Sequence, residues 1–552
     1  MKIKPLFKFT NATDFLTKYL MACGVEKSNL DLFLYPNSSC EENPWNYVNM
    51  NEAVDRLHEA IVDKQKVGII CDADCDGHMS ATVANQFLKS QGSSTIIFTH
   101  AGKTHGLIIN QDENMVEQVK DSDVKLLWIP DAGSHDAKQC KQLKDYGIDV
   151  LVTDHHPTTI EANPYAVVVN PHIKGNINLS GTAVTNLVVV AYCEKYGLPK
   201  PNYLDLVGLS TISDAMDLSA CVNRWFLTKG LVDNKNINPF VKKLIKKYGH
   251  GEAITPHMLS WNIIPKINSV TRSSDIKLKK LLIEALNTDN EEIQNEAVKQ
   301  SQKAHNCQVK TVKKMMEEIE PTLDMSHKGI VGFTDSSNKE YIGLVAGKIA
   351  GKYGKPCFLL RDGGKGSWTG SFRSNVPLVD IIKSCGIEGV GAEGQPSAAG
   401  VWMPKTKLDE FIEFIDGLPL EIEPEVEVAC ELKIDEITTP LCKEIESNEV
   451  LWGTGVPKPI FYINAKTSNA NVQVFRKKTN TVKLTIGDID FMLFQAKDED
   501  IESLTETPEY NIEMLVELQT NEWNGIVSPQ AMIKKFEVKT IEHEEVNWED
   551  LF

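Results

Sequence analysis

Acidic residues occur at alternate positions directly after an apolar segment near residue 70. The apolar "KVGII" is followed by "CDADCDG", which contains Asp72, Asp74 and Asp76. Three carboxylates this close repel one another, which favours protonation of one of them unless a cation lies among them. The spacing therefore predicts a metal site at the end of a strand.

Two later motifs repeat this arrangement. Asp131 opens "DAG" shortly after "VKLLWI", His155 and His156 lie in "DHH" after "DVLV", and Asp214 lies further on, in "STISDAMDL". Carboxylates with a single imidazole suit Mn²⁺ or Mg²⁺ better than Zn²⁺, which prefers Cys or several His. So many anionic ligands fit two ions, and an ion pair can stabilise both the attacking and the leaving oxygen of a phosphoryl displacement. The predicted metal ligands are Asp72, Asp74, Asp76, Asp131, His155 and Asp214.

Each motif taken alone has a simpler interpretation. An Asp at a strand end is more often a helix cap or a turn residue than a ligand, and Asp76-Gly77 fits a turn. Three such motifs at three strand ends favour a site instead. His156 is then the predicted catalytic group, which contacts the phosphate or helps a proton leave, and Asp131 is the predicted bridge between two ions.

The elements that must position these residues follow a strand-then-helix pattern between about 64 and 215. Short apolar segments alternate there with amphipathic segments, which predicts βαβ units and a parallel sheet. Ligands of open α/β sheets bind beyond the carboxyl ends of the strands, so the motifs should converge on one crevice.

The rest of the chain divides by pattern. Residues 277–320 predict a long helix or a helix pair, a second α/β pattern follows, and short β-like segments after 425 predict a small barrel or sandwich. The predicted division is 1–50 as an N-terminal extension, 51–276 and 321–424 as two α/β domains, 277–320 as connecting helices, and 425–552 as the β domain.

Composition excludes some classes of protein. At 552 residues, with 42% apolar and 24% charged residues, the chain is too long for one core. Its 12 Cys lack zinc or disulfide spacing, and no apolar run approaches the ~20 residues that span a bilayer, so we expect a cytoplasmic protein without a membrane contact. The net charge of -18 argues against coating nucleic acid with the whole surface but permits a local basic channel.

Collinear motifs over most of the chain resemble the RecJ family of single-strand-specific exonucleases in the DHH phosphoesterase superfamily. They are "DADCDG", "DAG", "DHH", "NPH", "LSGTAV", "STISDAMDL", "IIPKINSVTR", "YIGLVAGKIAGKYGKP", "GSFRS", "GQPSAAG", "LWGTGVPKPIF" and "NEWNG". The resemblance implies an α/β fold with a parallel-sheet DHH domain (51–276), a smaller α/β DHH-associated domain (321–424) and an OB-like β-barrel (425–552). It implies a two-metal phosphodiesterase that degrades single-stranded DNA from the 5′ end to 5′-mononucleotides in recombination, repair or replication. Single-strand-binding protein and helicases are candidate partners.

The same resemblance assigns substrate contacts. Arg272 corresponds to a phosphate contact, and Ser371 and Arg373 match the family's 5′-phosphate pocket. The residues alone agree, because in "GSFRSN" a fork-shaped Arg lies between the hydroxyls of Ser371 and Ser374 on a loop with a preceding Gly, although an exposed turn is the simpler interpretation of such a tetrapeptide. Gln395 stands where relatives carry His, which leaves a neutral amide on that side of the cleft.

A second departure from the family follows the first helix. The family's Arg and Tyr-Gly segment reads "FTHAGKTHGL" here, so Lys103 and His100 are predicted as substitutes.

The β domain carries aromatic residues beside cations. Trp452 and Arg476 are predicted to contact single-stranded DNA, because bases stack on rings while cations follow phosphates. Phe461 and Trp523 are expected to be buried, from their alternating neighbours. Removing 425–552 is expected to leave the metal crevice able to hydrolyse very short oligonucleotides.

Two alternatives remain open at this point. One is a DHH phosphodiesterase acting on short oligoribonucleotides or cyclic dinucleotides, against which the extra β domain argues. The other is a non-catalytic binding subunit, against which the complete set of predicted ligands argues.

Overall fold

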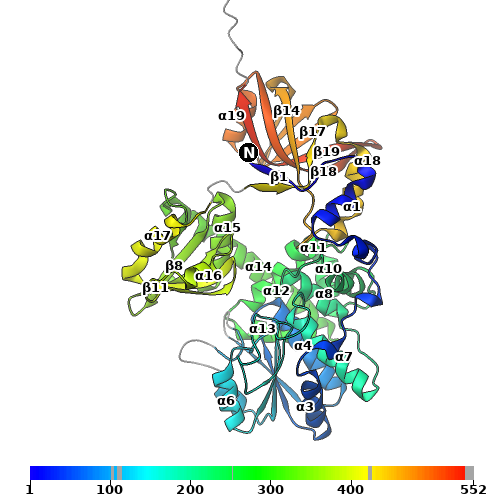
Figure 1. The fold of residues 1–552 in the computed structure, drawn as a ribbon, viewed down its shortest axis with the longest axis vertical. Helices are drawn as coiled ribbons and strands as arrows, with labels where there is room; N and C mark the ends of the chain where they lie inside the picture. Colours follow the sequence, from blue (N-terminus) through cyan, green and yellow to red (C-terminus); the bar gives the residue numbers. More distant parts are fainter. Residues whose placement is uncertain (101–104, 109–114, 252, 421–424, 541–552) are drawn as a thin grey trace, which may run out of the picture.

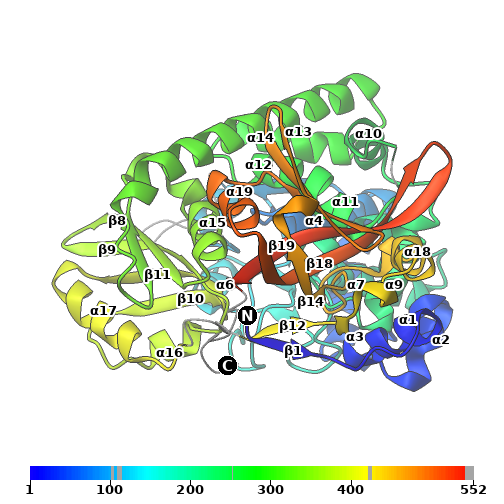
Figure 2. The ribbon, with the colours of Figure 1, turned by 90° about the horizontal axis from the view of Figure 1, so that it is seen from above.

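The computed structural model describes residues 1–552 except 101–104, 109–114, 252, 421–424 and 541–552. Figure 1 shows three lobes: an α/β lobe at the bottom, a smaller α/β lobe at its side, and a β lobe at the top. Seen from above, the β lobe lies over the helices of the first lobe, and the smaller lobe lies beside it (Figure 2).

The first lobe is built on a parallel five-stranded sheet with the order β3-β2-β4-β5-β6. Its strands are β2 (Val67–Cys71), β3 (Thr95–Thr99), β4 (Leu126–Pro130), β5 (Asp149–Thr153) and β6 (Val167–Val169). All residues of β2 and β4 are buried, as expected for strands that are covered by helices on both faces. The chain proceeds from β2 to β3 on one side and returns to β4 on the other, so the predicted crevice lies at a topological switch point.

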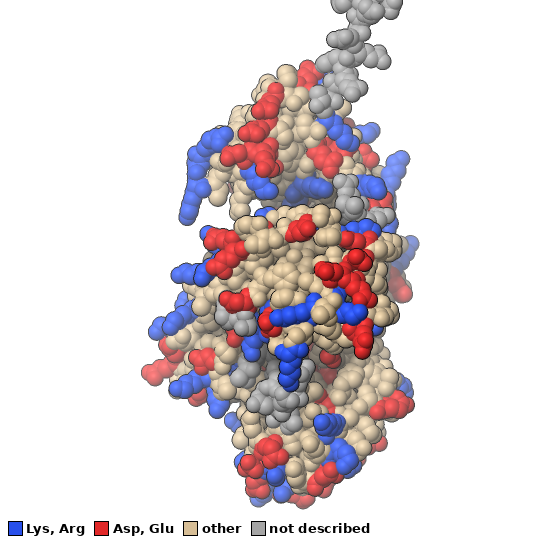
Figure 3. Space-filling model, turned by 90° about the vertical axis from the view of Figure 1, so that its left-hand side faces the viewer, with Lys and Arg blue, Asp and Glu red and all other residues tan. Residues whose placement is uncertain are grey.

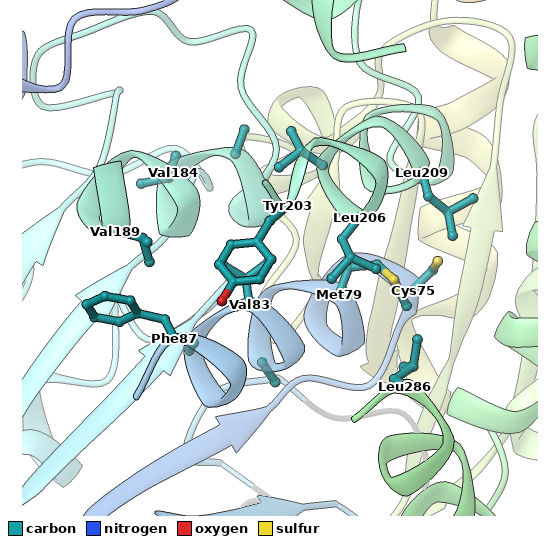
Figure 4. Close-up of a cluster of buried hydrophobic side chains, with 14 of the residues drawn as sticks. Cys75, Met79, Val83, Phe87, Val184, Val189, Tyr203, Leu206, Leu209 and Leu286 are labelled. Atoms are coloured by element: carbon teal, nitrogen blue, oxygen red, sulfur yellow. The ribbon is translucent and has the colours of Figure 1, made fainter. Parts of the chain in front are cut away.

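Helices cover both faces of this sheet. They are α3 (Met50–Val62), α4 (Cys75–Ser90), α5 (Val116–Lys120), α6 (Ala137–Asp145), α7 (Gly181–Tyr196) and α8 (Leu204–Ser213). Helix α4 begins directly after Asp74, whose carboxylate accepts a hydrogen bond from the Gly77 amide at 2.9 Å and caps the first turn. Met79, Val83 and Phe87 of α4 point toward α7 and α8 (Figure 4). This buried contact anchors the end of α4 that carries the acidic motif.

Further helices lead to the second lobe. They are α9 (Cys221–Leu227), α10 (Pro239–Tyr248), α11 (Pro256–Met258), α12 (Ile264–Thr271), α13 (Ile276–Leu286) and α14 (Glu291–Ile319). Helices α13 and α14 form a helix pair, which is one of the two alternatives predicted for 277–320. Helix α14 buries Ala297, Val298, Val312, Met315 and Ile319 along one stripe and exposes the opposite face, which is typical of an amphipathic helix.

The second lobe has a five-stranded sheet with the order β10-β11-β9-β8-β7, in which only β7 and β8 are parallel. Its elements are β7 (Ile330–Phe333), α15 (Ile342–Tyr353), β8 (Cys357–Gly364), β9 (Ser367–Arg373), α16 (Val379–Lys383), β10 (Gly391–Gln395), β11 (Ala398–Pro404) and α17 (Leu408–Gly417). The parallel pair needs a crossover, and α15 supplies it.

The third lobe has a seven-stranded sheet with the order β13-β14-β18-β19-β17-β16-β15. Its elements are β12 (Val426–Val428), β13 (Glu431–Leu432), α18 (Thr439–Ser447), β14 (Phe461–Ser468), β15 (Val472–Arg476), β16 (Asn480–Ile486), β17 (Ile489–Phe494), α19 (Asp498–Thr505), β18 (Glu509–Trp523) and β19 (Ile526–Thr540). The turn Asn524-Gly525 has positive φ at both residues and closes the long β18–β19 hairpin.

The segment 1–50 is divided between two lobes. Strand β1 (Ile3–Pro5) pairs in parallel with β12, and helix α1 (Ala12–Ala22) packs Phe15 and Tyr19 into the core of the third lobe. Tyr47 packs into the core of the first lobe. The predicted N-terminal extension is therefore structurally part of the first lobe, which follows it directly, and of the third lobe, which lies far from it in the sequence.

Charge on the surface is mixed. On the face drawn in Figure 3, Lys and Arg side chains are interspersed with Asp and Glu. Among the described residues, no helix is both long and apolar enough to cross a membrane.

Candidate metal centre

The predicted metal ligands meet at the carboxyl edge of the first sheet. Three overlapping groups have ligand atoms within 4.8 Å of one another: Asp72 with Asp74 and Asp131, Asp76 with His155 and Asp214, and Asp131 with both His155 and His156. All predicted ligands belong to these groups. The arrangement follows from the sheet, because β2, β4 and β5 each end at this edge.

Asp131 lies at the middle of the cluster. Its Oδ1 is 3.3 Å from His155 Nε2, is buried, and has no hydrogen-bond partner among the described residues. Its backbone has φ 67°, and a side chain at Gly181 would place Cβ only 2.2 Å from Oδ1, so the surroundings are shaped around this carboxylate. Burial, together with the charges of Asp76, Asp74 and Asp72, raises the pKa of Asp131 well above its ordinary value. A buried, unpartnered carboxylate oxygen among like charges fits a cation ligand.

The other members complete a set of oxygen ligands with one imidazole. Burial and the nearby Asp76 and Asp74 carboxylates raise the pKa of Asp214 well above its ordinary value. Burial lowers the pKa of His155, which keeps its ring neutral, and a neutral ring is the form that ligates metals. Asp76 accepts hydrogen bonds from the amides of Gly181 and Thr182 at 2.8 and 2.9 Å, so the α7 N-terminus orients it.

Asp154, which was not among the predicted site residues, holds the second histidine. Its buried carboxylate accepts hydrogen bonds from the His155 and His156 amides at 2.7 and 3.1 Å and contacts His156 Nδ1 at 2.8 Å. Burial lowers the pKa of His156, but this hydrogen bond outweighs it and raises the pKa to about 10. His156 is thus a cation near neutral pH, with its Nε2 free of the Asp154 contact. The signal was in the motif itself, because a carboxylate beside a ligand histidine is a common orienting partner.

His105 and Asp136, which were also not among the predicted site residues, lie at the Asp72 end of the cluster. His105 Nδ1 lies 2.5 Å from Asp72 Oδ2, and the Gly106 amide donates to Asp72 Oδ1 at 3.0 Å. Burial opposes ionisation of Asp72, but His105 holds its pKa below the ordinary value. Asp136 accepts from the Leu107 amide at 2.7 Å, and burial raises its pKa to about 6. No regular spacing links these residues, so only the folded loop brings them together.

Two arginines from different lobes lie close to each other near this edge. Arg272 directly follows α12, and its Nε is buried without a hydrogen-bond partner among the described residues. Burial and the proximity of Arg272 lower the pKa of Arg373, which ends β9. Ser371 shares the face of β9 with Arg373, since the two are separated by one residue. Two guanidinium groups close enough to influence each other fit an anion such as a phosphate.

Comparisons with known proteins agree with this geometry. The family model "DHH family, N-terminal domain" matches residues 66–211, and the model "RecJ OB domain" matches residues 428–535. The chain is thus similar to RecJ-type proteins of the DHH family.

Individual relatives align with nearly all of this chain. RecJ of Bacillus subtilis (strain 168), named a single-stranded-DNA-specific exonuclease, is 26% identical over 566 residues, which cover 97% of this chain and 69% of that protein. The YorK protein of Bacillus phage SPbeta is 25% identical over 90% of this chain and 92% of its own length. The crystal structure of RecJ in complex with Mn²⁺ from Thermus thermophilus has the same fold, with a TM-score of 0.76 at 21% identity, over 97% of this chain and 78% of that one.

The other residues predicted to contact the substrate differ in exposure and charge. Ser374 follows Arg373, and its hydroxyl accepts from the Val376 amide at 3.1 Å. Gln395 is exposed at the end of β10. Lys103 lies outside the described residues. His100 is buried, and burial lowers its pKa, so it is not a cation that could replace the family's Arg.

The aromatic predictions for the OB domain need correction. Trp452 is only 3% exposed, and its indole N–H donates to the Ile445 carbonyl at 3.1 Å, so it is not available to stack on a base. Trp523, expected to be buried, is 73% exposed because it lies at the tip of the β18–β19 hairpin. Phe461 is buried as expected. Arg476 is exposed, 3.5 Å from Asp498.

Proposed function

We propose that this chain is a metal-dependent exonuclease that degrades single-stranded DNA from the 5′ end and releases 5′-mononucleotides. The observation that carries the proposal is the unpartnered carboxylate oxygen of Asp131 at the centre of a buried carboxylate and imidazole cluster. RecJ of Bacillus subtilis is named a single-stranded-DNA-specific exonuclease, and the alignment with it covers 97% of this chain.

Two Mn²⁺ or Mg²⁺ ions would be held by the six predicted ligands, Asp72, Asp74, Asp76, Asp131, His155 and Asp214. Bound ions would supply Lewis-acid activation of the phosphodiester and neutralise the charge that develops on its oxygens. Hard oxygen ligands with one imidazole fit either metal.

The protein's own groups bind and orient the substrate. His156, kept cationic by Asp154, donates a hydrogen bond from Nε2 to a phosphate oxygen and stabilises negative charge there. Arg373, Arg272 and Ser371 bind the terminal 5′-phosphate, which gives the enzyme its direction along the strand. Gln395 is the neutral contact on the other side of that cleft, Ser374 shapes the loop, and Arg476 follows the phosphates of the longer strand.

We also propose a partner and a cellular role for this activity. Single-stranded DNA is the partner, and the role is in DNA recombination, repair or replication in the cytoplasm. Single-strand-binding protein or a helicase would deliver the strand.

The test is digestion of single-stranded DNA labelled at either end, with and without Mn²⁺, and with and without a 5′-phosphate. We expect Mn²⁺-dependent release of the 5′ label as a mononucleotide before the 3′ label. Parallel reactions with oligoribonucleotides and a cyclic dinucleotide test the alternative substrate class. Faster cleavage of either of these than of DNA, or loss of the 3′ label first, would contradict the proposal.

A further inference from the structure

The loop that follows Asp214 touches a turn of the OB domain. Asp214 directly follows α8, and the chain continues through 215–220 to α9. Within this loop, the Leu218 amide donates to the Thr454 carbonyl at 2.9 Å. We infer that the turn Gly453–Val456 of the OB domain is a positioning element for the metal ligand Asp214. The inference rests on the metal-binding role proposed above for Asp214.

Helix α8 holds the start of this loop through backbone hydrogen bonds. The Asp214 amide donates to the Ser210 carbonyl at 2.9 Å, and the Met216 amide donates to the Thr211 carbonyl at 3.0 Å. Ala215 has φ 53°, a left-handed conformation that is strained for a residue with a side chain and needs surrounding contacts to persist. Contacts from both lobes hold the middle of the loop: Asn223 of the first lobe donates to the Asp217 carbonyl, and the Leu218 amide donates to Thr454 of the OB-domain turn.

The OB-domain turn is a rigid support for that middle. Gly453 and Val456 exchange two backbone hydrogen bonds, at 2.7 and 3.1 Å. Val456 is completely buried and belongs to the same core as Leu451. Because both ends of the turn are fixed in this way, it cannot follow a displacement of the loop.

Glycine at two positions permits the close approach. A Cβ at Gly455 would lie 1.8 Å from Asp217 Oδ1, and a Cβ at Gly453 would lie 2.5 Å from the Leu218 side chain. Asp217 cannot move aside easily, because its Oδ1 accepts from the Ser219 amide at 2.8 Å and its carbonyl accepts from Asn223 Nδ2 at 2.9 Å. The two surfaces are thus in direct contact next to a metal ligand.

A buried arginine of α9, Arg224, also connects the first lobe to the OB domain. Arg224, in α9, is 1% exposed, and its Nη1 donates to the Val450 carbonyl at 3.0 Å. Its guanidinium also lies 4.9 Å from the ring centre of Phe33. Separating the lobes would remove the hydrogen bond of a buried cation, which is strongly unfavourable. In Figure 1 the β lobe accordingly stands directly on the helices of the first lobe.

These contacts change the expectation about removing 425–552. Such a truncation deletes the turn that supports the Asp214 loop as well as any strand-binding surface. We now expect the truncated chain to lose metal affinity and hydrolysis even of very short oligonucleotides.

The test uses the full chain with Gly455→Ala and the matched control Gly525→Ala. The two glycines have φ of 80° and 79°, so both variants carry the same backbone strain, but a Cβ at Gly525 meets nothing within 4 Å. Mn²⁺ affinity is measured by titration calorimetry without DNA, and hydrolysis with a very short 5′-phosphorylated oligonucleotide. Thermal unfolding verifies the fold.

Gly455→Ala should weaken Mn²⁺ binding roughly ten- to a hundredfold, as the loss of orienting contacts around metal ligands usually does. Gly525→Ala should bind as the wild type. Adding Asp217→Ala to Gly455→Ala removes the atom that the new Cβ meets and should restore part of the affinity. If Gly455→Ala does not fold, Gly453→Ala takes its place, because its Cβ would meet the movable end of the Leu218 side chain at 2.5 Å and the Pro256 ring at 3.2 Å, rather than a fixed carboxylate.

A folded Gly455→Ala protein with wild-type Mn²⁺ affinity and turnover would overturn the inference, as would a folded Gly453→Ala protein with both unchanged where that variant is used. Absence of nuclease activity in the wild type would reject the proposed function and leave the calorimetric comparison valid.

Discussion

Replacing Asp131 by Asn changes the charge of the metal centre while keeping its backbone and shape. Asp131 has φ 67°, and Asn tolerates this left-handed conformation whereas Ala would add strain. Asp123→Asn is the matched control, because Asp123 has φ 60° and an 89% exposed side chain.

The size of the effect follows from the distances. The ligand atoms of Asp72, Asp74 and Asp131 lie within 4.8 Å of one another. Two unit charges at that separation repel by about 3 to 4 kcal/mol at an effective dielectric constant of about 20. Proton uptake by Asp131 reduces this repulsion, because its pKa is raised and its protonated form is uncharged. The protonated form stabilises the fold, and it is lost as pH rises through that pKa. Without metal at pH 8, Asn should therefore raise the free energy of unfolding by about 2 to 4 kcal/mol.

The assay is thermal unfolding in EDTA and in excess Mn²⁺. In EDTA, Asp131→Asn should unfold several degrees above the wild type. In Mn²⁺ the order should reverse, because a ligand at about 1,000 times its Kd stabilises the wild type by about 4.1 kcal/mol and the variant has lost a ligand. Hydrolysis should be abolished, and Asp123→Asn should be neutral in both buffers. If Asp131→Asn destabilised the protein equally in EDTA and in Mn²⁺, the reasoning would be refuted and Asp131 would be a structural residue.

Three further predictions concern neighbouring groups. Asp154→Asn should return the pKa of His156 from about 10 toward 6.5, so the rate should fall about thirtyfold at pH 8 and little at pH 6; equal losses in the pH–rate profile would contradict this. Asp136 has a raised pKa of about 6, so its contribution to stability is complete below its ordinary value and disappears as pH rises through 6. In metal-free protein, Asp136→Asn should raise the unfolding free energy by about 3 kcal/mol at pH 8 and leave it unchanged near pH 3, measured with denaturant. Arg373→Ala should reduce the preference for a 5′-phosphate roughly ten- to a hundredfold in competition assays, and an unchanged preference would place the pocket elsewhere.

The core of the candidate site was predictable from the sequence because it follows from sheet geometry. Asp72, Asp131 and His155 each come directly or almost directly after an apolar strand, and parallel strands bring their carboxyl ends to one edge. The α/β class and the helix pair after residue 276 followed from periodicity in the same way. What was predictable is thus local spacing combined with one rule of parallel sheets.

The remaining features depend on contacts without a local signal. His105 reaches Asp72 through a loop, and Arg272 meets Arg373 only after two lobes pack together. Trp452 and Trp523 were assigned from their neighbours, but Trp452 packs into the core of the third lobe, where the Ile445 carbonyl accepts its indole N–H. The Asn-Gly turn after Trp523 is a strong hairpin signal and would have placed that ring at an exposed tip.

The pairing of β1 with β12 bears on how the chain is made. During synthesis the first lobe can fold once its helices have emerged, but Ile3–Pro5 must wait for Val426–Val428, and Phe15 must wait for strands beyond residue 460. Contacts this distant in sequence form late. On the ribosome, the apolar face of α1 therefore has no folded core to pack against for most of translation, and an apolar surface exposed in this way favours aggregation until the OB domain is complete.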